Sequence, residues 1–229
     1  MPPCERGSRT IQLPYLNTFE TIWEYENSFL SGEIDFYSSV GPACPICGDL
    51  HCYREITPYR RYVIELFPEF EKEWISIARF ICRKRRRTFS LLPIQLIPYF
   101  QYTVGAVIGA LLLGMECWQR GRRGFYGASW AVDSESLVTP WLIRCWLGVM
   151  LRGLHRGHAA LRRFYTLDGI RTPNRGGTWE EAAGYFEVFG LKPKRRWYPP
   201  LMELVDRYSR GTRQFLFGTA SQHRGSVCQ

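Results

Sequence analysis

The sequence predicts an α+β protein in which a small, degenerate zinc ribbon is followed by a mainly helical domain with a helix-turn-helix. Three observations lead to this prediction: a CPICG turn at residues 44–48, strand-like composition between residues 53 and 81, and long apolar segments after residue 93. We expect an N-terminal helical arm over residues 1–40, a ribbon-like domain over 41–92, the helical domain over 93–165, and a basic C-terminal extension over 166–229.

Composition indicates a folded, basic protein. A hydrophobic content of 45% over 229 residues can build packed cores, and a net charge of +9 favours a polyanionic partner, with nucleic acid first and an anionic membrane surface second. The chain has eight cysteines and opens without an apolar leader, so a reducing, cytoplasmic location is expected. The longest apolar run, residues 104–115, is shorter than the roughly 20 residues that cross a bilayer, which predicts no transmembrane helix and no membrane partner.

The N-terminal arm has the pattern of a packing helix. Aromatic and aliphatic side chains recur loosely at helical spacing, and Thr18 and Thr21 are candidate N-terminal caps. We expect this helix to pack against the ribbon, and an arm that binds a partner is the alternative.

Two segments of the ribbon, residues 53–65 and 73–81, have the Tyr, Ile, Val and Trp content of strands. Pro58 and Pro68 cannot donate to a strand ladder and are expected at bends or edges. In EWISIARFI the apolar residues come in pairs instead of alternating, so the second strand is predicted from composition.

Cysteines before the first of these strands and after the second suggest a metal site. Cys44 and Cys47 belong to the first turn and Cys82 to the second, and a structural zinc ion takes four nitrogen or sulfur ligands. A second C-x-x-C turn would place the fourth thiolate at Arg85, whose guanidinium stays protonated and cannot bind a metal. His51 and Cys52 are the two candidates for the fourth ligand. The alternative is a ribbon that has lost its metal and keeps its shape by packing.

The second turn carries five consecutive cations, Arg83, Lys84, Arg85, Arg86 and Arg87. Such a run can be a solvated surface, but crowding on one tight turn creates repulsion that a phosphate backbone relieves. We therefore predict that this turn contacts DNA.

The ribbon, the following RTFSLLP and the later IPYFQYTVGAVIGALLLG resemble the N-terminal zinc-ribbon and helix-turn-helix portion of insertion-sequence transposases. They resemble more closely a family of short, uncharacterised mobile-element proteins built from that portion alone. The matching positions are Phe80, Cys82, Thr88, Phe89 and Ser90. The resemblance covers roughly residues 41–150 and implies DNA binding, while the arginine at position 85 departs from the family pattern.

The second half of the chain reads as helical. Residues 94–118 form an apolar segment whose three glycines would allow neighbouring helices to pack closely. A turn at residues 133–134 precedes a long helix that starts near Ser136, with Ser134 or Ser136 as its cap and Pro140 in its first turn. A helix, a turn and a longer helix are the parts of a helix-turn-helix reader.

Cations recur on one broad face of that long helix if it is unbroken. At about 100° per residue this face holds Arg144, Arg152, His155, Arg156, Arg162 and Arg163. Ser136, Thr139 and Arg144 are predicted to contact base edges, and the remaining arginines to contact phosphates. A solvated helix end is the alternative, and Gly148, Gly153 and Gly157 are positions where a kink would scatter the face.

The C-terminal extension contains further helices and a basic, aromatic run. Thr178 and Glu181 form a capping-box pattern for a helix through Phe189, and residues 201–208 predict another short helix. Between them, residues 194–198 interleave cations with rings, which suits either a nucleic-acid surface or a linker.

These features predict a non-catalytic DNA-binding protein of mobile-element type. A metal-dependent transposase or nuclease would need three converging carboxylates, and the available ones lie in unsuitable turns and helices: Asp133, Asp168, and Glu180 or Glu187. Cys117 and Cys145 lie in apolar helices, and no carboxylate that could orient His155 or His158 is evident, which argues against nucleophilic catalysis. The main alternative is an accessory factor that binds a recombinase or transposase through its aromatic side chains.

Overall fold

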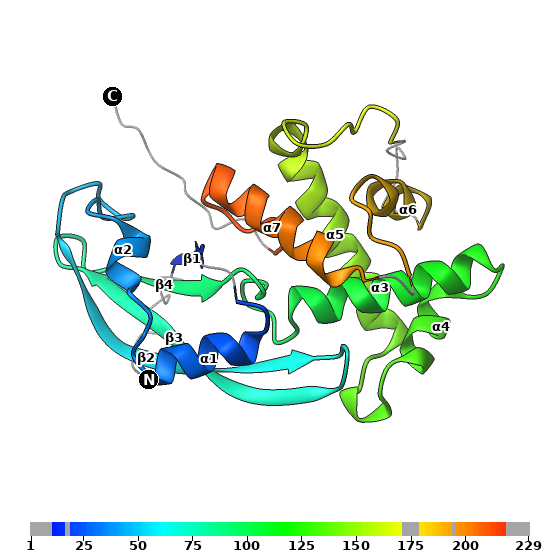
Figure 1. Cartoon of the computed structure of the whole chain (residues 1–229), viewed down its shortest axis with the longest axis horizontal. Coiled ribbons are helices and arrows are strands. Elements are labelled where there is room, and N and C mark those ends of the chain that lie inside the picture. The colour runs from blue at the N-terminus through cyan, green and yellow to red at the C-terminus, as the bar shows by residue number, and fades with distance from the viewer. Residues whose placement is uncertain (1–10, 17–18, 171–178, 194–195, 219–229) are drawn as a thin grey trace, which may run out of the picture.

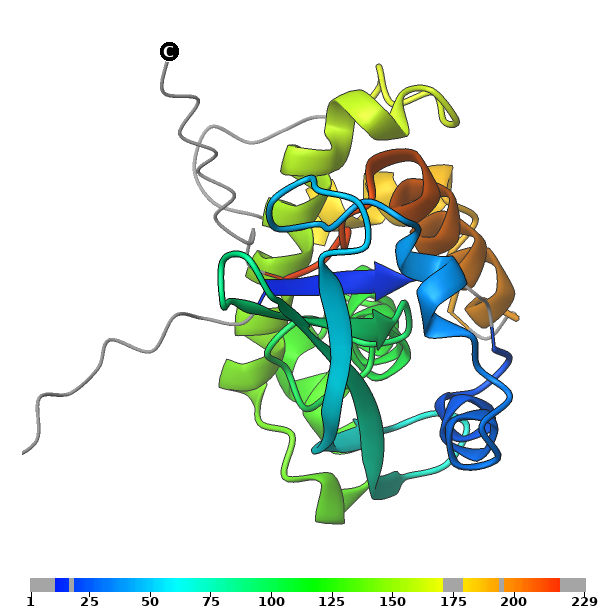
Figure 2. The same ribbon diagram turned by 90° about the vertical axis from the view of Figure 1, so that its left-hand side faces the viewer.

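A computed structural model describes residues 11–16, 19–170, 179–193 and 196–218, and it confirms the predicted α+β class. A four-stranded sheet, with α1 and α2, lies at one end of the molecule, and α3, α4, α5 and α6 lie at the other (Figure 1). The view in Figure 2 places the sheet in the foreground and the later helices behind it. Among the described helices, none is both long and apolar enough to span a membrane.

The sheet has the order β1-β4-β3-β2 and is mostly antiparallel. β2 (Tyr53–Glu65) and β3 (Glu71–Cys82) form a long hairpin, which confirms the two predicted strands. Pro58 lies at an irregularity in the edge strand β2, and Pro68 lies in the hairpin turn, as their missing N–H groups require. β4 (Thr88–Pro93) pairs with β3 on one side and, in parallel, with β1 (Ile11–Tyr15) on the other.

The strand β1 corrects the prediction of a helical arm for residues 11–15. β4 is buried along most of its length, so its free edge needs a partner for its backbone groups, and β1 supplies one. The rest of the arm is helical, with α1 (Ile22–Leu30) and α2 (Phe36–Val40). Thr21 caps α1 as predicted, because its side chain accepts from the Glu24 N–H, whereas Thr18 lies outside the described residues.

The predicted packing of the arm against the ribbon strands is confirmed for α1. The buried Tyr25 of this helix donates its hydroxyl to the Ser76 carbonyl of β3 at 3.0 Å. In the same core, Phe80 of β3 and Phe89 of β4 stack with ring centroids 5.2 Å apart. Aromatic packing therefore joins the first helix, the hairpin and β4 in one core.

The helical half is built around α3 (Val104–Gln119), which contacts α4 (Gly124–Ala131), α5 (Pro140–Leu161) and α6 (Trp179–Val188). α3 begins ten residues later than the predicted segment, because Thr103 caps it by accepting from the Ala106 N–H at 2.9 Å. Two backbone bonds tie the start of α3 to the hairpin, from Ile64 N–H to the Gln101 carbonyl and from Thr103 N–H to the Ile64 carbonyl.

The long helix α5 is continuous across Gly148, Gly153 and Gly157, but its cap differs from the prediction. Thr139 is the cap, with its Oγ1 accepting from the Leu142 N–H at 3.2 Å, and the predicted caps at 134 and 136 lie in a short 3₁₀ turn, Ser134–Ser136. Pro140 occupies the first turn of the helix as expected. A helix, a turn and a helix follow one another here, and their use in reading DNA stays a prediction.

The C-terminal helices complete the second core. α6 begins at Trp179, next to the predicted cap Thr178, which lies outside the described residues, as do residues 194 and 195 of the basic run. The short helix predicted for 201–208 is part of the longer α7 (Tyr198–Thr212), which packs on α5.

The predicted close packing at glycines makes Gly114→Ala a sharp test of this core. A Cβ at Gly114 of α3 would lie 2.6 Å from the Trp179 ring and 3.1 Å from the Gly124 carbonyl oxygen, so we expect it to cost about 1–3 kcal/mol. Gly148→Ala in α5 is the matched control, since its Cβ would meet only the flexible Arg152 side chain and should stabilise by up to about 1 kcal/mol. Urea unfolding measures both, and equal effects would contradict the packing.

Candidate metal centre

The CPICG segment folds into a tight turn that presents two thiols. The Gly48 N–H donates to the Cys44 carbonyl at 2.8 Å, and the Cys44 N–H donates to the Asp49 carbonyl at 2.9 Å. Gly48 has a φ of +79°, in the left-handed region where glycine has no steric cost. The turn closes through a bridge between Ala43 and Leu50, so the backbone holds Cys44 and Cys47 on one side of it.

The second turn joins β3 to β4 and starts at Cys82. The Arg86 N–H donates to the Cys82 carbonyl at 2.8 Å, and the Cys82 N–H donates to the Arg87 carbonyl at 2.9 Å. The Arg85 N–H also points at the Cys82 sulfur, 3.3 Å away. This amide stabilises negative charge on the sulfur, although the Arg85 side chain itself supplies no ligand.

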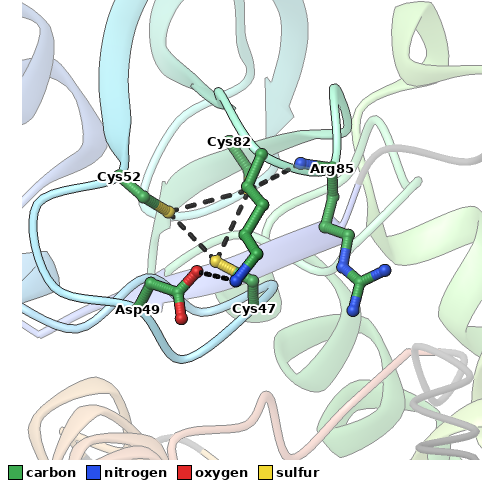
Figure 3. A network of polar contacts seen from close by, with 6 residues as sticks. Cys47, Asp49, Cys52, Cys82 and Arg85 are labelled. Atoms are coloured by element: carbon green, nitrogen blue, oxygen red, sulfur yellow. Dashed lines mark hydrogen bonds and ion pairs between the residues drawn. The ribbon is translucent and has the colours of Figure 1, made fainter.

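Four sulfur atoms from these segments come together, with all pairs within 4.8 Å: Cys44, Cys47, Cys52 and Cys82. The Cys52–Cys82 and Cys47–Cys82 Sγ distances are 3.7 Å, and the Cys47–Cys52 distance is 3.0 Å (Figure 3). Sulfurs about 2.3 Å from one tetrahedral zinc ion lie about 3.8 Å apart, which two of these distances match closely. The cluster could therefore hold a metal ion.

Cys52, and not His51, completes this cluster. His51 has a φ of +52° and an exposed side chain, and it is not one of the four clustered residues. Cys52 is fixed because its carbonyl accepts the Arg83 N–H at 2.9 Å, which ties the start of β2 to the second turn. The structure thus brings together three of the predicted ligands with one of the two candidates for the fourth.

The thiols differ in acidity before any metal binds. Hydrogen bonding to Cys47 and burial raise the pKa of Cys52. Burial also acts to raise the pKa of Cys82, but the Arg85 N–H and the neighbouring thiols outweigh it and lower that pKa below its ordinary value. Since only thiolates bind metal, the lowered pKa prepares the Cys82 thiol for ligation.

An ion pair links the two turns outside the cluster. Lys84 Nζ lies 2.7 Å from an Asp49 carboxylate oxygen, and this contact lowers the pKa of Asp49 and raises that of Lys84. All five cations of the second turn are exposed, and of these five only Lys84 forms an ion pair within the described part of the chain. A run of positive charge therefore lies beside the cysteine cluster.

The structure corrects much of the predicted basic helix face. α5 ends at Leu161, so Arg162 and Arg163 lie beyond the helix, and Arg162 pairs with Asp168 at 2.8 Å. Arg156 donates to the Gly218 carbonyl at 2.5 Å, which leaves Arg144 and Arg152 as exposed arginines of α5 without a hydrogen bond in the described structure.

Of the residues predicted to contact base edges, Ser136 is buried. Ser136 is 4% exposed, its hydroxyl donates to the Asp133 carbonyl and its own carbonyl accepts from Tyr102. Thr139 is exposed, and its Oγ1 accepts as the α5 cap while its O–H group can still donate, so the predicted base contacts of Thr139 and Arg144 stay predictions.

The expectation that His155 lacks a carboxylate partner was wrong. His155 Nε2 pairs with Glu181, a buried residue of α6. Sequence reasoning missed this contact because the two residues lie on different helices. In the described part of the chain, the four cysteines are the one group of three or more Cys, His, Asp or Glu side chains that converges in this way.

Fold and site define an α+β protein with a four-cysteine cluster able to hold a metal ion. Comparison with models of known protein families, with curated proteins and with solved structures gives no match for this chain. The resemblance to mobile-element proteins therefore stays a prediction from the residues quoted above.

Proposed function

We propose that this protein is a zinc-containing, DNA-binding protein of mobile-element type. The observation that carries the proposal is one turn with two roles: it supplies the buried Cys82 to the sulfur cluster and exposes five cations beside it. Zinc fits the donor set because it prefers four thiolates in a closed tetrahedral site. The assignment to mobile elements follows from the sequence resemblance alone.

The proposed role of zinc is structural. Its four thiolates would tie the first turn to the second, so that the cations of residues 83–87 keep a fixed shape. A rigid loop loses less conformational entropy on binding than a free one, which favours contact with a phosphate backbone. Arg144 and Arg152 of α5 offer additional cations, and Arg144 and the exposed Thr139 are the candidates for base contacts.

A protein-binding accessory factor is the second candidate, and one observation favours it. Large apolar side chains are strongly exposed around the turn between α4 and α5, with Trp130 at 83%, Leu137 at 81% and Trp141 at 71%. Exposed tryptophans often anchor protein interfaces. An apolar interface should respond weakly to salt, whereas phosphate contacts respond strongly, so a salt series separates the two functions.

The test uses the full-length protein, a 30-base-pair duplex and fluorescence anisotropy between 50 and 200 mM KCl. Replacing the four arginines at 83, 85, 86 and 87 with glutamine should make the slope of log K against log salt less steep by about 3–4, since each phosphate contact contributes roughly 0.9. Lys84 is kept because it pairs with Asp49.

The control removes the same charge elsewhere by replacing exposed arginines outside this turn with glutamine: Arg120 and Arg207, which pair with Glu116 and Glu203, and Arg122 and Arg213. We expect this variant to keep a slope close to that of the wild type. Equal slopes for the two variants, or a wild-type protein that does not bind the duplex, would contradict the proposed contact.

A further inference from the structure

A cavity of about 1050 Å³ opens between three separate segments on the side of the molecule that carries α1 and α7. Its walls come from the N-terminal end of α1, the turn that joins β2 to β3, and the N-terminal end of α7. Small-molecule sites usually measure about 300–1,000 Å³, so this space admits a whole organic molecule or a peptide side chain with its neighbours. The DNA-binding proposal makes no use of this cavity.

Aromatic rings form much of the wall, and several meet at steep angles. The Phe67 and Trp197 ring centroids are 5.9 Å apart at 85°, and those of Trp197 and Tyr198 are 5.8 Å apart at 69°. Phe19 and Trp23 line the same space from the side of α1. An aromatic wall suits a cation, because the face of an aromatic ring carries partial negative charge.

Two glycines of α3 leave the space in which these rings pack against the helix. A Cβ at Gly105 would lie 2.9 Å from the Tyr198 ring, and one at Gly109 would overlap the Phe67 ring and lie 2.9 Å from the Trp197 ring. The rings therefore pack directly on the helix backbone. Close packing limits their rotation, so the site is largely formed before a ligand arrives.

The charge of the cavity lining is opposite in sign to the net charge of the protein. The net charge of the chain is +9, yet among the described residues the cavity is lined by one guanidinium, Arg196, and by four carboxylates: Glu20, Glu65, Glu69 and Glu71. Glu65 lies deepest, with 8% of its surface exposed, and accepts from the Thr103 hydroxyl at 2.7 Å and the Leu66 N–H at 3.2 Å. Burial raises the pKa of Glu65 to about 7, and a bound cation would favour its ionised form.

We propose that this cavity binds an organic cation, a guanidinium or alkylammonium group, held by the aromatic faces and the carboxylates. An anion would face the four carboxylates, and a neutral ligand would gain nothing from them, so the lining selects for positive charge. Two sources share this chemistry, a basic side chain of a partner protein and a free small amine. The inference is independent of DNA binding.

Calorimetry on the full-length protein at pH 8 tests the charge requirement with two probes of the same shape. N-acetylarginine amide should bind at least tenfold more tightly than its neutral counterpart, N-acetylcitrulline amide. Replacing the exposed carboxylates Glu20, Glu69 and Glu71 with glutamine should weaken binding of the arginine probe at least tenfold. These three residues are exposed, so the variant is expected to fold.

The control variant replaces three exposed carboxylates outside the cavity, Glu33, Glu73 and Glu203, and should bind like the wild type. Two further probes separate the sources: agmatine represents a free small amine, and a capped Gly-Arg-Gly peptide represents a basic side chain of a partner protein. A tenfold preference for either supports the proposal and identifies the kind of ligand. Equal affinity for the arginine and citrulline probes, an unchanged rim variant, or no binding of any probe would overturn it.

Discussion

Serine in place of Cys82 is expected to remove the bound zinc and to lower the free energy of unfolding by about 4 kcal/mol or more. Cys82 is 0% exposed and is the last residue of β3, directly before the basic turn. Loss of its thiolate therefore leaves a metal site with three ligands in a buried part of the sheet. Elemental analysis should find about one zinc ion per wild-type chain and far less in the variant. Urea unfolding should show the corresponding fall in stability.

Three further variants test which residues complete the site. Cys52→Ser should lose zinc as Cys82→Ser does, because both sulfurs belong to the cluster. His51→Ala and Cys145→Ser should keep it, since neither residue belongs to the cluster. Wild-type protein that unfolds cooperatively but contains no zinc would contradict the zinc proposal, and zinc lost only in His51→Ala would move the fourth ligand to that histidine.

Most of the cysteine site could be predicted because its chemistry is local. The CPICG turn and the strand composition after it place Cys44 and Cys47 opposite Cys82 once the hairpin forms. The choice between His51 and Cys52 could not be made, because it depends on the positive φ at 51 and on the bond from the Arg83 amide to the Cys52 carbonyl. Both features are set by how the two turns meet.

Other features depend on contacts between distant segments, which patterns along the chain do not contain. The five residues of β1 have too little periodicity to show that they pair with β4. The basic face of α5 was overestimated because helical angles assume that the helix continues, whereas it ends at Leu161. The cavity went unpredicted because its rings come from three separate segments, although the glycines of α3 signalled that something packs closely there.

The second large effect expected is a stabilisation by Glu65→Gln that grows with pH. Burial raises the pKa of Glu65 from an ordinary value of 4.5 to about 7 in the folded protein. Between these two values the unfolded chain loses the proton while the folded protein keeps it, so the wild type loses stability as pH rises from 4.5 to 7. Above pH 7 the loss levels off on the order of 3 kcal/mol, since each pKa unit corresponds to about 1.4 kcal/mol.

Glutamine avoids this loss because it does not ionise. Its amide oxygen can replace the carboxylate oxygen that accepts from the Leu66 N–H, and its NH2 group can donate to the Thr103 hydroxyl, which then accepts instead of donating. Urea unfolding of both proteins at pH 5.5 and pH 8 should show a stabilisation by Glu65→Gln that is larger at pH 8 by about 2 kcal/mol. Glu73→Gln, at an exposed position of β3, serves as the control and should show no such change. A stabilisation by Glu65→Gln that is the same at both pH values would mean that Glu65 ionises normally, and the buried carboxylate would then offer a cation in the cavity full charge even in mild acid.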